Sequence, residues 1–516
     1  MAIHPTTLID GLKNPAAFPH SCQQIQVMET HISWVVLTGQ RAYKIKKPVN
    51  LGFVDFTTLT QRRHFCEEEL RLNRRLAPDL YLDVVPITGT LQNPQVDGDG
   101  PAIDYAVRML QFDQPNLLSN LSRSELQHHH IDDLADRCGQ FHLAATVADA
   151  GSEFGTPDGI MTSVRENFDV LCAAEDPIAE MASGLRRLAE QQFQLLKPVF
   201  EQRRQNGMVR ECHGDMHLGN MFLQRDHVVV FDGIEFNEGF RWIDIINDMA
   251  FAVMDFEDRN LNDLARRFLN RWLENTGDYA GLRVLPFYAA YRAAVRAKID
   301  AIRLNQPEVS SSEQRHLSKD CLGYLEQARH HTAVRQPWLL ITTGPSGSGK
   351  TTVTQGLIEA TETIRIRSDV ERKRLFGLRP EESSDSGTKH RMYSPETTTA
   401  VYDHLATLAT QVITAGFPVV VDATFLKQAE RERFAALAAE LQVPYGIIRC
   451  DAEPDTLKQR IQSRRQQQAD ASEADATVLQ QQLQTAEPLS SAELRSAIDG
   501  HVADLAAAVR QKLLPR

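Results

Sequence analysis

Short apolar runs separated by turn-like segments open the chain. IQVM, WVVL and AYKIK follow one another between residues 25 and 49, with ETHIS and TGQR between them. This spacing predicts a three-stranded antiparallel meander. A charged helix and two more strands, the strands divided by a Gly/Asp/Pro turn, are predicted next at 62–77, 81–87 and 104–110.

Helical spacing dominates the following two hundred residues. Apolar positions recur with a helical period from about 116 to 205 and again over 241–331. Between these stretches VVVF at 228–231 is a short continuous apolar run, which predicts a buried strand. The segment HHTAVRQP at 330–337 ends this pattern.

A different order begins after that segment, because strands and helices now alternate. Strands are predicted at 338–342, 363–367, 418–421 and 445–450, and helices at 349–361, 396–415 and 428–441. Alternation of this kind predicts a parallel α/β sheet. We therefore predict two domains, residues 1–331 and 338–516, joined by a linker at 332–337.

Composition narrows the class of protein. A chain of 516 residues exceeds one ordinary hydrophobic core, and 42% apolar with 24% charged residues is typical of a soluble globular protein. The formal net charge of -12 argues against a large nucleic-acid or anionic-membrane surface. No secretion signal and no apolar stretch of about 18 residues is visible, and the seven cysteines form no CxxC pair. A cytoplasmic protein with reduced thiols is expected.

The sequence GPSGSGKT, from Gly344 to Thr351, fits the GxxxxGK[ST] pattern between a predicted strand and a predicted helix. Its glycines let backbone N–H groups converge on phosphate oxygens, and the helix N-terminus adds positive charge. Lys350 is expected to reach the β- and γ-phosphates and Thr351 to hold Mg²⁺. The predicted nucleotide-binding residues are Gly344, Pro345, Ser346, Gly347, Ser348, Gly349, Lys350, Thr351 and Thr352.

Two acidic positions extend this predicted site. Asp422 ends the apolar strand PVVVD, at the sheet edge where ligands bind in such folds, and is a predicted Mg²⁺ partner. The alternative is a strand-ending aspartate that caps the next turn. Ser368-Asp369, with Arg372, follows the strand TIRIR directly. Here the chain resembles the P-loop kinases that phosphorylate hydroxyls, especially bacteriophage-type polynucleotide kinase and the zeta-toxin-like group.

That resemblance implies that Asp369 takes the proton of the acceptor hydroxyl and that Arg372 contacts an acceptor phosphate. An N-cap aspartate followed by a solvated arginine is the alternative. Arg460 and Arg464 lie four residues apart, on one face of a predicted helix. In these kinases such arginines come from a lid that closes over ATP, and a solvated basic face is the other interpretation.

The first domain contains the sequence HGDMHLGN, from His213 to Asn220. It resembles the HGDxxxxN loop of aminoglycoside and choline phosphotransferases, which are relatives of the protein kinases. The resemblance implies that Asp215 orients or deprotonates the acceptor hydroxyl and that Asn220 binds Mg²⁺. Asp232, which follows the run VVVF, falls where the family's metal-binding aspartate lies. Mg²⁺ favours such carboxylate and amide oxygens.

A phosphate-anchoring lysine is expected on the third strand. Lys44, in the tripeptide AYK, matches the A-x-K pattern of kinase folds, but Lys46 faces the same way because strand side chains repeat every two residues. Glu69 is the predicted partner from the next helix, with Glu67 and Glu68 as alternatives. A solvated KIKK strand end is the interpretation without a function. The glycine-rich loop of protein kinases is missing from the first hairpin.

The first domain contains two further clusters of polar residues. Asp244 and Asp248, four apart on a predicted helix, resemble the family segment that braces the catalytic loop. His128, His129 and His130 begin another helix. Consecutive helical side chains point about 100° apart and do not easily share one ion, so the three histidines receive no role.

Taken whole, the chain resembles bacterial fusion proteins that join an aminoglycoside-phosphotransferase-like part, here 25–310, to an AAA-type P-loop kinase-like part, here 337–514. The resemblance implies an N-terminal protein-kinase-like α+β bilobal fold and a C-terminal α/β P-loop fold. ATP and Mg²⁺ are the expected cofactors, and each site is expected to transfer the γ-phosphate to a hydroxyl of a small molecule. A 5′-hydroxyl polynucleotide kinase and a non-catalytic ATP-binding switch are the alternatives. Fold does not fix substrate, so neither acceptor is identified.

Overall fold

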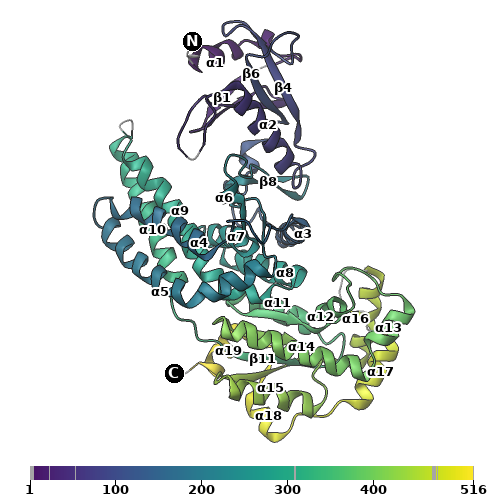
Figure 1. Cartoon of the computed structure of the whole chain (residues 1–516). Helices are drawn as coiled ribbons and strands as arrows, with labels where there is room; N and C mark the ends of the chain where they lie inside the picture. Colours follow the sequence, from purple (N-terminus) through teal and green to yellow (C-terminus); the bar gives the residue numbers. More distant parts are fainter. Residues whose placement is uncertain are drawn as a thin grey trace. The chain divides into compact units, whose positions relative to one another are not determined.

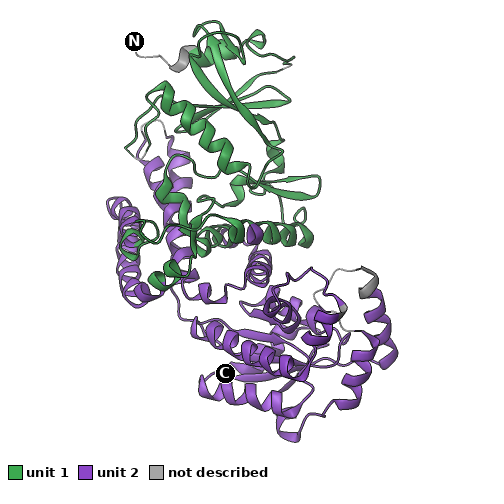
Figure 2. Ribbon diagram, turned by 45° about the vertical axis from the view of Figure 1, so that its right-hand side comes forward, with its two compact units in different colours: residues 1–137, 141–160, 200–255 green, residues 138–140, 161–199, 256–516 purple. Residues whose placement is uncertain are grey.

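The chain forms two compact units in the computed structural model (Figure 1; Figure 2). Unit 1 comprises residues 1–137, 141–160 and 200–255, and unit 2 comprises residues 138–140, 161–199 and 256–516. The structure describes residues 5–22, 24–52, 54–306, 309–467, 472 and 475–514. The predicted linker at 332–337 lies within unit 2, and the domain boundary there stays a prediction.

A six-stranded antiparallel sheet forms the N-terminal part of unit 1. Its order is β1-β2-β3-β6-β4-β5, and the predicted meander is confirmed as its first three strands. The predicted helix is α2 (Leu59–Asn73), which Thr58 caps by accepting the N–H of Gln61, and which packs against β4 and β6. The strands are β1 Gln26–Glu29, β2 Ser33–Leu37, β3 Arg41–Lys46, β4 Tyr81–Gly89, β5 Pro94–Val96 and β6 Asp104–Leu110.

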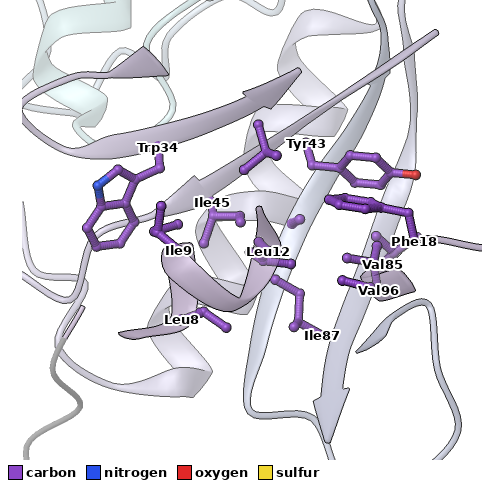
Figure 3. Close-up of a cluster of buried hydrophobic side chains, with 13 residues drawn as sticks. Leu8, Ile9, Leu12, Phe18, Trp34, Tyr43, Ile45, Val85, Ile87 and Val96 are labelled. Carbon is purple, nitrogen blue, oxygen red and sulfur yellow. The ribbon is translucent and has the colours of Figure 1, made fainter. Parts of the chain in front are cut away.

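A short helix that the apolar pattern did not predict, α1 (Pro5–Leu12), covers one face of this sheet (Figure 3). Each fully buried aliphatic side chain in such a layer stabilises the fold by about 1.5–3 kcal/mol. Since Tyr43 and Ile45 of β3 face this layer, Lys44 and Lys46 point to the opposite face. The layer contains, among others, Leu8, Ile9, Leu12, Phe18, Trp34, Tyr43, Ile45, Val85, Ile87 and Val96.

The remainder of unit 1 is built from short strands and helices. β7 (Val209–Glu211) pairs with β10 (Trp242–Asp244), and β8 (Met221–Gln224) pairs with β9 (His227–Val230), both antiparallel. The strand predicted at 228–231 is therefore the second arm of a hairpin whose first arm the apolar pattern did not reveal. The loop from His213 to Asn220 joins β7 to this hairpin.

Unit 2 contains a five-stranded parallel sheet of order β12-β13-β11-β14-β15. The predicted parallel sheet is confirmed, and β15 is an additional strand that the sequence did not indicate. The order places β11, which leads into the GPSGSGKT loop, at the centre and β12 at one edge. The strands are β11 Leu339–Thr343, β12 Ile364–Arg367, β13 Val419–Asp422, β14 Tyr445–Arg449 and β15 Ala497–Asp499.

The helical stretches are more divided than the apolar period suggested. Three separate helices, α3, α4 and α5, occupy most of the region predicted as helical from 116 to 205. None of the described helices has both the length and the apolar character that crossing a membrane requires. The helices beyond α2 are α3 His128–Ala144, α4 Pro157–Cys172, α5 Ile178–Gln205, α6 Glu238–Arg241, α7 Ile245–Asp258, α8 Asn262–Thr276, α9 Leu285–Leu304, α10 Ser311–His331, α11 Lys350–Ala360, α12 Ser368–Leu375, α13 Ser386–Met392, α14 Pro395–Thr414, α15 Gln428–Glu440, α16 Pro454–Gln467, α17 Ala476–Thr485, α18 Ser491–Ser496 and α19 Leu505–Leu513.

Candidate active sites

The loop after β7 is held by one buried carboxylate. Asp248, on α7, accepts the backbone N–H of His213 and that of Gly214, each at 2.9 Å. Burial would raise the pKa of Asp248, but its hydrogen bond from His142 lowers it. Gly214 has φ 86°, and a Cβ there would lie 2.6 Å from the carbonyl oxygen of Phe240. Asp248 therefore fixes the start of the loop, in agreement with the bracing role that its position suggested.

The ring of His213 has a defined tautomer. Its Nε2 lies 2.9 Å from the carbonyl oxygen of Phe231, and its Nδ1 accepts the backbone N–H of Asp215 at 3.3 Å. Because Nδ1 accepts a hydrogen bond, Nε2 carries the proton and the ring is neutral. Burial also lowers the pKa of His213, which favours the neutral ring. The histidine thus positions Asp215 from behind and does not act as a charged group.

Asp215 and Asn220 lie side by side in this loop. The amide nitrogen of Asn220 donates to the carboxylate of Asp215 at 2.9 Å and to its backbone carbonyl at 3.0 Å. With its nitrogen bound to Asp215, Asn220 has its amide oxygen left to face a cation. His217 Nε2 lies 3.3 Å from the Asp215 carboxylate, which is half-buried.

Asp232 joins this loop to the sheet. It has a left-handed backbone, φ 62°, and its N–H donates to the hydroxyl of Tyr81 at 3.1 Å. Its carboxylate, 39% exposed, pairs with Lys44 of β3, and Lys44 also pairs with Glu69 of α2 at 2.8 Å. Strand β3, helix α2 and the end of the β8–β9 hairpin therefore meet at one lysine. The predicted residues Lys44, Glu69, Asp232, Asn220 and Asp215 all lie in this region of unit 1.

Lys46 lies deeper and shares the partner Glu69 with Lys44. It is fully buried and forms ion pairs with Glu69, at 2.5 Å, and with Glu235. Burial would raise the pKa of Glu69, but the ammonium groups of Lys44 and Lys46 lower it to about 2. Burial raises the pKa of Glu235 despite its lysine partner. Sequence reasoning missed Glu235, because a glutamate that follows a strand by a few residues has no distinguishing spacing.

The oxygen donors of the unit 1 site are of the kind that binds a magnesium ion. The backbone carbonyl of Asn220 accepts the N–H of Phe231 at 2.9 Å, which brings Asn220 beside Asp232. An amide oxygen and a partly exposed carboxylate are oxygen donors of the kind Mg²⁺ prefers, and the ion usually completes its shell with phosphates and water. Asn220 and Asp232 are therefore the residues that would hold it.

Two of the three consecutive histidines do converge, contrary to expectation. The Nε2 atoms of His129 and His130 lie 3.0 and 2.8 Å from one carboxylate oxygen of Asp226. However, Nδ1 of His130 accepts the N–H of Gln127 at 3.1 Å, so its Nε2 carries a proton and donates to Asp226. A metal ligand needs a lone pair on that nitrogen. The cluster is therefore a hydrogen-bonded helix start.

In unit 2 the GPSGSGKT loop adopts a backbone that only glycine permits. Gly344, Gly347 and Gly349 have φ of 145°, 83° and 93°. A Cβ at Gly344 would lie 2.1 Å from the carbonyl oxygen of Cys450, and one at Gly347 would lie 2.9 Å from that of Leu457. The loop is thus closely packed from behind, and its N–H groups at the start of α11 form the kind of cradle that holds phosphate.

Lys350 and Thr351 occupy the first turn of α11. Lys350 Nζ donates to the carbonyl oxygens of Gly344 and Pro345, each at 2.9 Å, and so lies across the loop. The hydroxyl of Thr351 donates to Asp422 at 2.9 Å. A threonine hydroxyl beside a strand-ending carboxylate fits a magnesium ion that accompanies nucleotide phosphates. Asp422, predicted as a Mg²⁺ partner, therefore lies at the predicted threonine.

A pocket of about 380 Å³ gathers this loop with the residues predicted on the acceptor side. Asp369 is in the first turn of α12, whose N-cap residue is Arg367, so Asp369 is not the N-cap residue of that helix. Arg372 is buried over the ring of Tyr393, donates to the carbonyl oxygen of Met392 at 2.6 Å, and has no partner for its Nε among the described residues. The predicted residues that line the pocket are Ser346, Gly347, Gly349, Lys350, Thr351, Thr352, Asp369, Arg372, Asp422 and Arg460.

Of the two arginines predicted to belong to a lid, the structure describes the side chain of Arg460. Arg460 of α16 lines the pocket and donates to the carbonyl oxygen of Gly347 at 3.2 Å. The side chain of Arg464 lies outside the described residues. Gln482 of α17 also reaches the loop, because its amide oxygen accepts the N–H of Ser346 at 2.8 Å. Sequence reasoning missed Gln482 and Arg367, both pocket residues, since neither lies in a recognisable motif.

Comparison with known proteins gives the relationship of the whole chain. Residues 339–489 match the family model AAA_33, described as an AAA domain. Uncharacterized protein Rv2004c of Mycobacterium tuberculosis and Uncharacterized protein Mb2027c of Mycobacterium bovis are each 30% identical to this chain over 464 residues, which is 88% of this chain and 89% of theirs. The chain belongs to their family. The similarity therefore extends over most of the chain and over most of each relative.

Solved structures give weaker likenesses. Amicoumacin kinase hAmiN in complex with AMP-PNP, Ca²⁺ and Ami is 12% identical with a TM-score of 0.40, covering 63% of this chain and 94% of its own. A putative kinase from Chloroflexus aurantiacus is 24% identical with a TM-score of 0.28, covering 35% of this chain and 100% of its own. At these TM-scores neither likeness says anything about activity. The sheets of the two units, the loop at 213–220 and the AAA match confirm the predicted two-part architecture.

Proposed function

We propose that the chain is an ATP-dependent phosphotransferase with two nucleotide sites, each of which transfers the γ-phosphate to a hydroxyl group of a small molecule. The observation that carries this proposal is the pocket of unit 2, in which a phosphate-binding loop and its threonine–aspartate pair face a second aspartate, Asp369. A site that only binds nucleotide has no need of an additional carboxylate on the acceptor side.

In the unit 2 site, Lys350 and the loop N–H groups hold the triphosphate, and Thr351 with Asp422 would hold Mg²⁺, which neutralises phosphate charge. Asp369 orients the acceptor hydroxyl and accepts its proton. The acceptor oxygen then forms a bond to the γ-phosphorus, while the bond from that phosphorus to the β–γ bridging oxygen breaks and ADP leaves. We assign contact with an anionic group of the acceptor to Arg372, whose buried Nε has no hydrogen-bond partner within the described part of the chain.

In the unit 1 site, we assign phosphate binding to Lys44, because it borders the partly exposed Asp232 whereas Lys46 is fully buried. Glu69 orients Lys44, and Asn220 with Asp232 would hold Mg²⁺. Asp215, held by Asn220, accepts the proton of the second acceptor. The same bond exchange at the γ-phosphorus then gives a phosphorylated alcohol and ADP. A cytoplasmic location, where ATP and Mg²⁺ are abundant, is part of this proposal.

The test is ATP turnover by the full chain with a panel of aminoglycosides, sugars, nucleosides and 5′-hydroxyl oligonucleotides. Asp215→Ala and Asp369→Ala are each expected to lower one transfer activity by about a hundredfold or more. Lys350→Ala is expected to lower the same activity as Asp369→Ala. Asp455→Ala, at an aspartate of α16 whose side chain is 90% exposed, is the matched control.

The outcomes separate the proposal from its alternatives. Transfer to oligonucleotides alone would identify an end-processing polynucleotide kinase, for which the shared pocket of Asp369 and Arg372 is the supporting observation. ATP hydrolysis that no acceptor and neither aspartate substitution changes would identify a regulatory switch. Either result would refute transfer to small molecules.

A further inference from the structure

The edge of the parallel sheet in unit 2 is covered by a helix from the preceding half of the chain. β12 is the first strand in the sheet order and pairs with β13. The outer side of such a strand presents N–H and C=O groups that need partners. Helix α8 packs against β12 and α11, and Figure 1 shows α8 beside α11. α8 lies about ninety residues before β12 in the sequence, and both belong to unit 2.

One side chain of α8 imitates a neighbouring strand. The amide oxygen of Asn270 accepts the N–H of Arg365 at 2.8 Å, and its nitrogen donates to the carbonyl oxygen of Thr363 at 3.3 Å. A parallel strand would bind the same two backbone groups, one on each side of Ile364. Tyr279, just after α8, donates to the remaining carbonyl oxygen of Arg365 at 3.4 Å. These contacts fix the position of β12 directly before Asp369.

One turn further along α8, Glu274 connects the helix to the pocket. Its carboxylate accepts from Nε and from a terminal nitrogen of Arg365, at 2.9 and 2.8 Å, and lies 3.6 Å from the guanidinium of Arg367. Arg365 also donates to the backbone carbonyl of Thr351, at 3.3 Å, and Arg367 lines the pocket. Glu274 is 1% exposed. Burial would raise its pKa, but Arg365 and Arg367 lower it, so the group is ionised.

The end of α8 is joined to the helix that carries Asp369. Arg374 of α12 donates to the carbonyl oxygens of Glu274, at 2.5 Å, and of Asn275, at 3.3 Å. Gly277 ends α8 with φ 73°, and a Cβ there would lie 2.9 Å from the guanidinium of Arg374. The guanidinium therefore stacks closely on the helix end, and α12 has little freedom to shift relative to α8.

We propose that Glu274 is a positioning residue of the unit 2 site: through Arg365 and Arg367 it sets the distance between the magnesium-binding threonine and the acceptor side of the pocket. Glu274 itself touches no reacting group. The inference rests on the proposed phosphotransferase function of this site. Under this proposal, helix α8, which precedes the predicted linker, helps to position the P-loop site that follows the linker.

The test compares Glu274→Gln with Glu359→Gln in the full chain. Glu359 of α11 forms an ion pair with Arg267 of α8 at 2.6 Å, whereas Glu274 of α8 pairs with Arg365 and Arg367 of β12. Both substitutions are made in a Lys44→Met background, which weakens nucleotide binding by the unit 1 site about 10- to 100-fold. ATP hydrolysis with water as acceptor is measured, and the part that Lys350→Ala removes is assigned to the unit 2 site. Glu274→Gln is expected to lower kcat about tenfold or more, the ordinary effect of losing a charged hydrogen bond, with KM for MgATP little changed. Glu359→Gln is expected to leave both parameters unchanged.

Two further variants separate positioning from loss of folding. Glu274→Asp keeps the charge and is expected to retain most of kcat. Arg367→Gln combined with Glu274→Gln is expected to lower kcat by less than the product of the single effects, because the two residues act through one contact. Thermal melting of every variant monitors folding.

Each result has a distinct meaning. If the Lys44→Met parent shows no ATP turnover that Lys350→Ala removes, the proposed function of this site fails and the inference fails with it. If the parent is active but Glu274→Gln and Glu359→Gln lower kcat equally, the positioning role alone is overturned. The same holds if Glu274→Asp loses as much activity as Glu274→Gln, or if the double variant is additive.

Discussion

Lys44 and Lys46 share one strand and one partner, Glu69, but the structure predicts different consequences when each is replaced by methionine. Lys46→Met leaves Glu235 and part of Glu69 uncompensated in a fully buried position, which costs about 3–5 kcal/mol. Lys44→Met leaves Glu69 paired with Lys46 and Asp232 partly solvated, so the cost is that of an ordinary hydrogen bond, about 1 kcal/mol. For a unit of this size the melting temperature should fall by roughly 6–20 °C in the first case and roughly 3 °C in the second.

Nucleotide binding should follow the opposite order. Titration calorimetry with Mg²⁺ and a non-hydrolysable ATP analogue, in a Lys350→Ala background that leaves the unit 1 site, measures it. Lys44→Met should weaken binding about 10- to 100-fold, because a charged hydrogen bond to phosphate is lost. Lys46→Met should leave the affinity nearly unchanged below its melting temperature. Lys47→Met is the control, since Lys47 pairs with the exposed Glu29 at 2.6 Å.

The reasoning is refuted if the two effects are exchanged. Tight binding by Lys44→Met, together with loss of binding by a well-folded Lys46→Met, would make Lys46 the phosphate-anchoring lysine. Equal melting temperatures for the two variants would show that the buried pair with Glu235 adds nothing to stability.

Three other substitutions or conditions give further tests. Gly344→Ala places a Cβ 2.1 Å from the carbonyl oxygen of Cys450 on a backbone with φ 145°, so calorimetry should show no nucleotide binding at the unit 2 site; normal affinity would contradict the assigned loop geometry. Gln482→Ala frees the N–H of Ser346 and should tighten nucleotide binding at that site by about 2- to 10-fold, whereas weaker binding would mean that Gln482 is a ligand contact. The pKa of Glu69 is about 2 in the folded chain, below its unfolded value of about 4. The contribution of this carboxylate to stability is therefore present above pH 4 and is lost as the pH falls toward 2. The melting temperatures of wild type and Glu69→Gln should converge over that range.

The parts of the sites that the sequence predicted lie in short segments whose chemistry and spacing are local. The GPSGSGKT loop, the loop from His213 to Asn220 and the strand-ending aspartates Asp232 and Asp422 each follow from a few adjacent residues. Strand alternation and the helix after it were enough to place Glu69 opposite β3. The choice between Lys44 and Lys46 could not be made from periodicity, because both side chains share one face and differ only in depth.

The parts that the sequence did not predict depend on contacts between distant segments. Glu235 and Lys46 form an ion pair although they are 189 residues apart in the sequence, and Glu274 and Arg365 do so at a separation of 91 residues. A buried glutamate and an exposed one look alike in an amphipathic helix until the packing partner is known. The convergence of His129 and His130 also depended on a remote residue, Asp226, which the angle between neighbouring helical residues does not reveal.

The capping of β12 by α8 has a consequence for how the chain can be divided. A fragment that begins after the predicted linker would lose Asn270 and Tyr279, leaving the outer N–H and C=O groups of the edge strand β12 open to water. Such an edge readily recruits the same edge of another copy, so truncated chains should self-associate into aggregates. The fusion of the two halves is then a solubility requirement as well as a linkage of two chemistries.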